Sequence, residues 1–230
     1  MPADLTSIAE PRFILLAWAA GLSVAGGVIG MGRIVGPGFL WLAAGTTGLV
    51  GLTGVFAAGA WWARLALMLT ILALIWAGNS AFAGLMMVLA GLGFVIEAGV
   101  VGGWLPAISA AAALGGVTGE MMLGHWYLVD PRLPRSALRG LAYAGIAGLA
   151  VDGLVLGLAG GMPGGGAAFA FWVLLATSIV LMAAVVGALR YPAYSGVMAA
   201  TGLSYLAVLT TLGAVFLGRA LVAGLGPFVS

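Results

Sequence analysis

Residues 167–189 read AAFAFWVLLATSIVLMAAVVGAL, a run without a single charged side chain. A helix needs roughly 20 mainly apolar residues to cross the hydrocarbon core of a bilayer, and this run supplies them. Similar runs recur along the whole chain with short breaks between them. The sequence therefore predicts about eight transmembrane helices, near residues 13–32, 38–58, 61–77, 81–101, 106–128, 138–160, 167–189 and 196–220.

The composition excludes a water-soluble globule. Of the 230 residues, 63% are hydrophobic and only 6% are charged, whereas soluble domains carry about 25% charged residues. We expect an all-α, polytopic integral membrane bundle with short loops. Residues 1–230 form one transmembrane domain, which begins with a short acidic segment, 1–12. A bacterial inner (cytoplasmic) membrane is the expected location.

Several function classes are excluded by the residues that are missing or rare. The chain has no cysteine, one histidine, no lysine and a net charge of +2. Thiolate chemistry and clusters of imidazole metal ligands are therefore not expected, and neither is a basic surface for nucleic acid. A haem would need a ligand from another chain, because His125 is the only imidazole.

The arginines predict the orientation of the bundle. Arg132, Arg135 and Arg139 lie in and beside the longest break between helices, and cytoplasmic loops are enriched in such residues. Placing this loop in the cytoplasm puts Arg33 and Arg190 on the same side, and it leaves three arginines outside. Those three are Arg12, Arg64 and Arg219. We expect Arg132, Arg135 and Arg139 to contact lipid phosphates or a partner protein.

Acidic residues inside the predicted helices are expected to have a polar partner or a function, because burying each one at membrane depth costs at least roughly 2.5 to 3.5 kcal/mol. Glu120 and Asp152 lie well inside their helices, and Glu97 lies near a helix end. Two interpretations stay open for Glu120 and Asp152. They pair with polar groups on neighbouring helices, or they belong to a proton or ligand pathway.

Residues 119–135, GEMMLGHWYLVDPRLPR, gather the only histidine with aromatic and charged side chains. His125, Trp126 and Tyr127 are typical of an interfacial anchor. Alternatively, His125 hydrogen-bonds a ligand such as a quinone carbonyl while Trp126 or Tyr127 lies against its ring. Glu120 and His125 are about 140° apart on a regular helix, so one shared site would require unwinding near Gly124.

Glycine occurs 40 times, and small residues let helix backbones approach closely in lipid. Gly153, Gly157 and Gly161 are spaced by four residues and therefore share one helix face. We expect this ladder to pack against another helix of the chain, or to form a seam with another subunit.

Three functions remain open, and none rests on a self-contained catalytic motif. The first is a membrane subunit of an electron-transfer or other energy-converting complex, with a quinone or cofactor site near the cytoplasmic boundary. The second is a carrier for protons, ions or a small solute that uses Glu120 and Asp152. The third is a structural scaffold. Membrane lipids and other membrane subunits, or further copies of this chain, are the expected partners.

Overall fold

The computed structural model describes residues 5–56, 59–158 and 165–224, and the regular structure in these ranges is entirely helical. Eight α-helices follow one another along the described chain: α1 (Pro11–Met31), α2 (Pro37–Gly51), α3 (Trp61–Ile75), α4 (Ser80–Gly102), α5 (Trp104–Val129), α6 (Arg135–Leu158), α7 (Gly166–Arg190) and α8 (Tyr194–Val222). Short 3-10 helices precede α1 and follow α2, at Leu5–Ala9 and Leu52–Gly54.

Each predicted span contains one helix, but only six of the described helices are long and apolar enough to cross a membrane. The exceptions are α2 and α3, with 15 residues each. Such a helix is about 22 Å long, which is shorter than the roughly 30 Å hydrocarbon core. The sequence predicted longer helices there because apolar residues continue beyond the point where the α-helical hydrogen bonding stops. The predicted ends at residues 58 and 160 lie outside the described residues.

Local signals in the sequence account for several helix ends. Pro11 and Pro37 open α1 and α2, where a missing backbone N–H costs nothing. The Asn79 side chain caps α4 by accepting a hydrogen bond from the Phe82 N–H at 3.3 Å. Gly103 separates α4 from α5 with a φ of 93°, a conformation that favours glycine.

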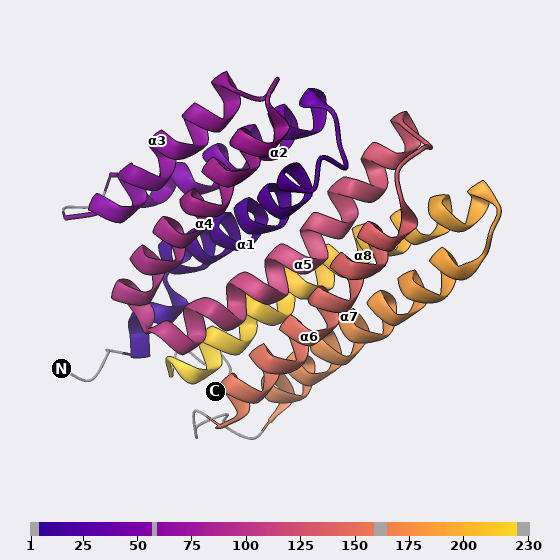
Figure 1. Cartoon of the computed structure of the whole chain (residues 1–230). Coiled ribbons are helices and arrows are strands. Elements are labelled where there is room, and N and C mark those ends of the chain that lie inside the picture. The colour runs from indigo at the N-terminus through magenta and orange to yellow at the C-terminus, as the bar shows by residue number, and fades with distance from the viewer. Residues whose placement is uncertain (1–4, 57–58, 159–164, 225–230) are drawn as a thin grey trace.

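The contacts between helices arrange the described bundle as two neighbouring rings, α1–α4 and α5–α8, and in Figure 1 α5 lies between α1 and α6. In the first ring, α1 contacts α2 and α4, while α3 contacts α2 and α4. In the second ring, α5 contacts α6 and α8, while α7 contacts α6 and α8. The rings meet where α5 packs against α1 and α4. We call the end that holds the α1–α2, α5–α6 and α7–α8 connections the α5–α6 end, and the other the terminal end.

The closest helix packing occurs at glycines, because these residues let backbones touch. A Cβ atom on Gly116 of α5 would lie 2.6 Å from the Cα atom of Gly145 of α6. A Cβ atom on Gly21 of α1 would lie 2.8 Å from the Cα atom of Gly115. These two seams join α5 to its neighbours on both sides.

Of the predicted ladder of Gly153, Gly157 and Gly161, the two described residues face side chains of α7 and not its backbone. Gly153 is buried against the Leu175 side chain, whereas Gly157 is exposed, and a Cβ atom there would lie 3.5 Å from the Trp172 ring. Gly161 lies outside the described residues. Four-residue spacing identifies a shared helix face, but it does not say whether that face meets a backbone, a side chain or lipid.

Candidate functional site

Glu120 is the least expected side chain in the interior. It lies on α5 with 0% of its surface exposed, and neither carboxyl oxygen has a hydrogen-bond partner of normal geometry among the described residues. Gly124, one turn further along α5, provides the space beside it. A Cβ atom on Gly124 would lie 3.7 Å from Glu120 Oε1 and 2.8 Å from Thr201 Oγ1 of α8. The carboxyl group therefore lies at the seam between α5 and α8.

Two hydroxyl groups of α8 border this seam, and both lie within hydrogen-bond distance of a carbonyl group of their own helix. The Thr201 hydroxyl donates to the Val197 carbonyl at 2.9 Å, and the Ser204 hydroxyl donates to the Thr201 carbonyl at 2.9 Å. Ser204 lies beside the Glu120 carboxyl. The Ser204 hydroxyl can donate to a Glu120 carboxylate or accept from a protonated carboxyl, because a hydroxyl group rotates to suit its partner. We call Glu120, Thr201 and Ser204 the Glu120 site.

His125 lies one residue beyond Gly124 and contacts the same helix, α8. Its Nδ1 atom lies 3.1 Å from the Tyr205 hydroxyl, and the two rings meet edge to face with centroids 6.4 Å apart. Both side chains are exposed. The His125–Tyr205 pair thus lies at the outer surface of the α5–α8 seam, next in sequence to Gly124 and Ser204 of the buried part.

The predicted grouping of His125 with Trp126 and Tyr127 does not occur. Trp126 packs edge to face against Phe39 of α2, with centroids 6.1 Å apart, and Tyr127 is buried in the core. Helix α5 continues without a break through Gly124, so consecutive side chains point in different directions. The ring against His125 is that of Tyr205, which the sequence analysis did not assign to this site.

Asp152 has a different environment from Glu120, because a cation neutralises it. Arg219 of α8, with 0% exposure, donates to both carboxylate oxygens of Asp152, at 2.7 and 3.0 Å. Ser109 of α5 donates to Asp152 Oδ1 at 2.6 Å, and Arg219 also donates to the Pro106 carbonyl at 3.1 Å. The Phe13 ring lies 5.6 Å from the guanidinium carbon. This bidentate pair ties α5, α6 and α8 together near the terminal end.

The third acid inside a helix, Glu97, is also paired. Arg12 of α1 donates to Glu97 Oε1 of α4 at 2.6 Å, and the Glu97 side chain is 5% exposed. Glu120 is consequently the one carboxyl group within the described helices that has no cation as partner, and the polar groups beside it are hydroxyls of α8.

The three arginines in the α5–α6 connection and in the first turns of α6 differ in their surroundings. Arg135 donates to the backbone carbonyls of Tyr191, Pro192 and Ala193, and so fastens the start of α6 to the α7–α8 turn. Arg132 is 96% exposed and lies 4.0 Å from Asp130, while Arg139 is exposed. Arg132 and Arg139 have room for a lipid phosphate or a partner, whereas the Arg135 guanidinium already binds three acceptors of its own chain.

The chain matches no protein-family model, no curated protein and no solved structure.

Proposed function

We propose that the chain is an integral protein of a bacterial cytoplasmic membrane that acts as a proton-coupled carrier, with Glu120 as the group that takes up and releases the proton. The observation that carries this proposal is a fully buried carboxyl group that has no cation as partner and lies beside hydroxyl groups only. Acids at membrane depth that lack a structural partner are characteristic of proton and ion pathways.

The two ends of the α5–α8 seam support transfer from one side of the membrane. At the α5–α6 end, the exposed His125–Tyr205 pair lies beside the Glu120 site and consists of two groups that can both donate and accept a proton. Toward the terminal end, the same seam is closed by Arg219, Asp152 and Ser109, in which Arg219 and Ser109 both donate hydrogen bonds to the Asp152 carboxylate. We infer that Glu120 exchanges protons through the His125 end in the conformation described.

The orientation of the bundle supports a cytoplasmic α5–α6 end. Arg12 and Arg219, two of the three arginines at the terminal end, form ion pairs with Glu97 and Asp152. Because these two arginines stabilise the fold through ion pairs, we leave them out when we compare the loop arginines on the two sides of the membrane under the positive-inside rule. The arginine asymmetry between the two ends is larger than the sequence alone indicates.

Labelling of single cysteines tests this topology, since the native chain contains none. Cysteines at Ser136 and Gly166 should react with impermeant reagents from opposite sides of the membrane, because α6 lies between them. A cysteine at Thr53, between α2 and α3, should react from the Gly166 side if these two short helices cross the membrane where the bilayer is locally thinner. Reaction of Ser136 and Gly166 variants from the same side would contradict the topology.

Replacing Glu120 by glutamine should abolish proton coupling while the protein stays folded. Glutamine has the same size and is uncharged, so we expect the free energy of unfolding to change by no more than about 1 kcal/mol. In proteoliposomes with an internal pH indicator, protein-dependent proton uptake should fall to the level of empty vesicles. Infrared difference spectra between low and high pH should also lose the carbonyl band of a protonated carboxyl group.

Asp130→Asn is the matched control for Glu120→Gln, because Asp130 lies outside the helices in the α5–α6 connection. This variant should retain both the proton uptake and the infrared band. The proposal is wrong if Glu120→Gln retains both, or if it loses uptake only in proportion to unfolded protein.

One observation favours a second function, the membrane subunit of an electron-transfer complex. His125 is exposed, and its contact with Tyr205 through Nδ1 fixes the ring while Nε2 has no hydrogen-bond partner among the described residues. A quinone carbonyl is a suitable ligand for that nitrogen. Purification in mild detergent, with mass spectrometry of co-purifying chains and an absorbance spectrum, separates the two functions. Stoichiometric partners with haem or flavin bands would support the subunit, and a lone colourless protein would support the carrier.

A further inference from the structure

The helices at the two edges of the bundle differ in length. At one edge, α3 has 15 residues and contacts α2 and α4, and at the other, α7 has 25 residues and contacts α6 and α8 (Figure 1). At 1.5 Å per residue, these helices are about 22 and about 38 Å long. The hydrocarbon core of a bilayer is roughly 30 Å thick. Helix α7 therefore exceeds the core, whereas α3 falls short of it by about 8 Å.

Aromatic rings mark both ends of the exposed side of α3. Trp61 is the first residue of the helix and Trp76 directly follows it, and these side chains are 73% and 53% exposed. Tryptophan collects at the headgroup level of a membrane. The two rings therefore mark headgroup levels only about 22 Å apart. The exposed side chains between them, which we call the α3 face, are all apolar: Trp62, Leu65, Met68, Ile71 and Ile75.

The missing length of α3 lies entirely at the terminal end. At the α5–α6 end, the Trp76 ring packs edge to face against Phe82 in the first turn of α4, with centroids 5.7 Å apart. At the other end, a Cβ atom on Gly93 of α4 would lie 3.1 Å from the Trp62 carbonyl oxygen. Gly93 lies nine residues before Gly102, where α4 ends. Helix α4 therefore extends about 14 Å beyond the start of α3.

A cation lies at this recessed start of α3. Arg64 is in the first turn of the helix, where its guanidinium carbon lies 5.6 Å from the centroid of the Trp61 ring. Its Nε atom donates to the Val55 carbonyl at 3.3 Å. Charged side chains are rare at membrane depth, and arginines near helix ends extend to the headgroup level. Trp61 and Arg64 together indicate that the headgroups meet α3 well below the end of α4.

The backbone that leads to α3 lies at the same level. Residues 52–56 form a 3-10 helix and a turn, and the Phe56 side chain is 80% exposed. Gly54 packs against the side chain of Leu16, which lies five residues, or about 8 Å, inside α1. Irregular backbone exposed to lipid does not occur in the hydrocarbon region, because its N–H and C=O groups would lack hydrogen bonds. This connection therefore requires headgroups or water around it.

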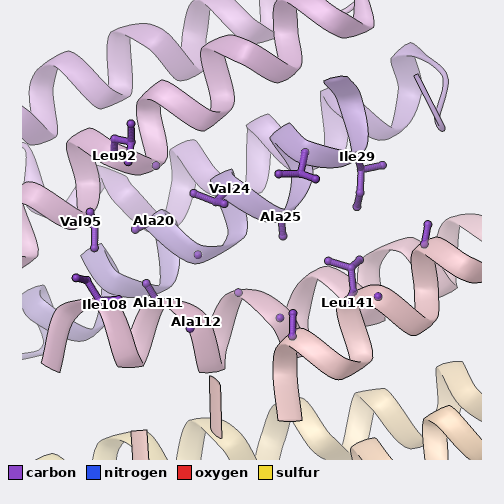
Figure 2. A pocket seen from close by; sticks show the side chains of 18 of the residues that line it. Ala20, Val24, Ala25, Ile29, Leu92, Val95, Ile108, Ala111, Ala112 and Leu141 are labelled. Atoms are coloured by element: carbon purple, nitrogen blue, oxygen red, sulfur yellow. The ribbon is translucent and has the colours of Figure 1, made fainter. Parts of the chain in front are cut away.

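The other side of α4 is apolar at this level. Leu92 and Val95, which flank Gly93 in the sequence, line a groove bordered by α1, α5 and α6 (Figure 2). The described residues that line this groove include no charged or aromatic side chain. No headgroup level is marked on that side of α4 near Gly93. The recessed boundary is thus confined to the side of α4 that α2 and α3 cover.

We propose that the α3 face thins the bilayer by about 8 Å, and that the thinning is confined to the leaflet at the terminal end. Lipid headgroups then meet Trp61 and Arg64, and α2 and α3 cross the membrane as the six longer helices do. A bilayer adapts to a short hydrophobic helix by thinning locally. A partner helix of ordinary length would instead place apolar side chains beside Arg64. The proposal does not rest on the function of Glu120, which lies at the α5–α8 seam.

Depth measurements on spin-labelled single cysteines test the proposal, since the native chain contains none. Leu65→Cys on α3 and its matched control Val180→Cys on α7 are both exposed positions, each 11 residues from an exposed ring at the α5–α6 end, Trp76 or Tyr191. In vesicles of phosphatidylcholine with 18-carbon chains, a uniform bilayer would hold both labels near its centre. We expect the Leu65 label about 6 Å from the terminal-side headgroups, since Trp61 is four residues away, and the Val180 label about 15 Å from them. A water-soluble nickel reagent should therefore reach only the Leu65 label.

Vesicles of different thickness provide the second arm of the test. Lengthening the acyl chains from 14 to 22 carbons should move the Val180 label deeper, whereas the Leu65 label should keep its distance from the headgroups. Equal depths of the two labels, or equal deepening of both in thicker bilayers, would overturn the proposal. A Leu65 label that neither oxygen nor the nickel reagent reaches would overturn it in favour of a protein partner on the α3 face. None of these results depends on proton uptake through Glu120.

Discussion

Arg219→Met is expected to destabilise the folded protein by about 3 to 5 kcal/mol, the usual loss when one partner of a buried ion pair is removed. The substitution leaves Asp152 with only Ser109 as a donor, in an interior where the carboxylate is 2% exposed. Thermal unfolding of the purified protein in detergent measures this loss. Arg12→Met should cost less, because the Arg12 side chain is already 26% exposed.

The double variant Asp152→Asn/Arg219→Met separates a structural role from a role in the pathway. With both charges removed, Ser109 still has an oxygen to donate to, and most of the lost stability should return. A fully stable double variant that has lost activity would instead show that Asp152 belongs to the proton pathway. Normal stability of Arg219→Met alone would mean that the ion pair does not hold α6 and α8 together.

Gly116→Leu is expected to prevent stable packing of α5 against α6. A Cβ atom at this position would lie 2.6 Å from Gly145 Cα and 2.9 Å from the carbonyl carbon of Ala144, and backbone atoms cannot move aside as a flexible side chain can. The loss should reach at least about 3 kcal/mol, the upper part of the range for overpacked interiors. Size-exclusion profiles and unfolding temperatures in detergent would show aggregation or early melting.

Gly157→Leu is the matched control on α6. Its Cβ atom would meet only the Trp172 ring at an ordinary contact distance, and leucine is the better helix former by several tenths of a kcal/mol. This variant should melt at or slightly above the temperature of the native protein. If instead Gly157→Leu were the destabilised variant and Gly116→Leu the stable one, the assignment of the close seam would be reversed.

The positions of the helices could be predicted because each depends on a local property, the length of an apolar run between turn residues. The true lengths of α2 and α3 could not be predicted from the sequence. Apolar residues continue past Gly51 into the 3-10 turn, and hydropathy does not distinguish helical from non-helical backbone. The sequence also could not show which of the 40 glycines lie at backbone contacts, since such a contact depends on the rotation of two helices about their axes.

The candidate site was predictable only in part. Buried charge alone identified Glu120 and Asp152, because each side chain lies deep in an apolar run. Their different surroundings depend on α8, far along the chain, which brings a guanidinium to Asp152 and only hydroxyls to Glu120. Arg219 lies inside the last predicted span, so the rule that charges at membrane depth pair with one another could have matched it to Asp152.

The division into two rings also permits assembly in two stages. Each ring closes through contacts among four consecutive helices, so α1–α4 can complete their contacts while the ribosome is still making α5. Until α5 is made, the face of α1 around Gly21 is exposed on the outside of the α1–α4 ring. Packing of α5 onto that face joins the two rings. In a nascent chain arrested before α5, the same small-residue face would be free to pack against any neighbouring helix.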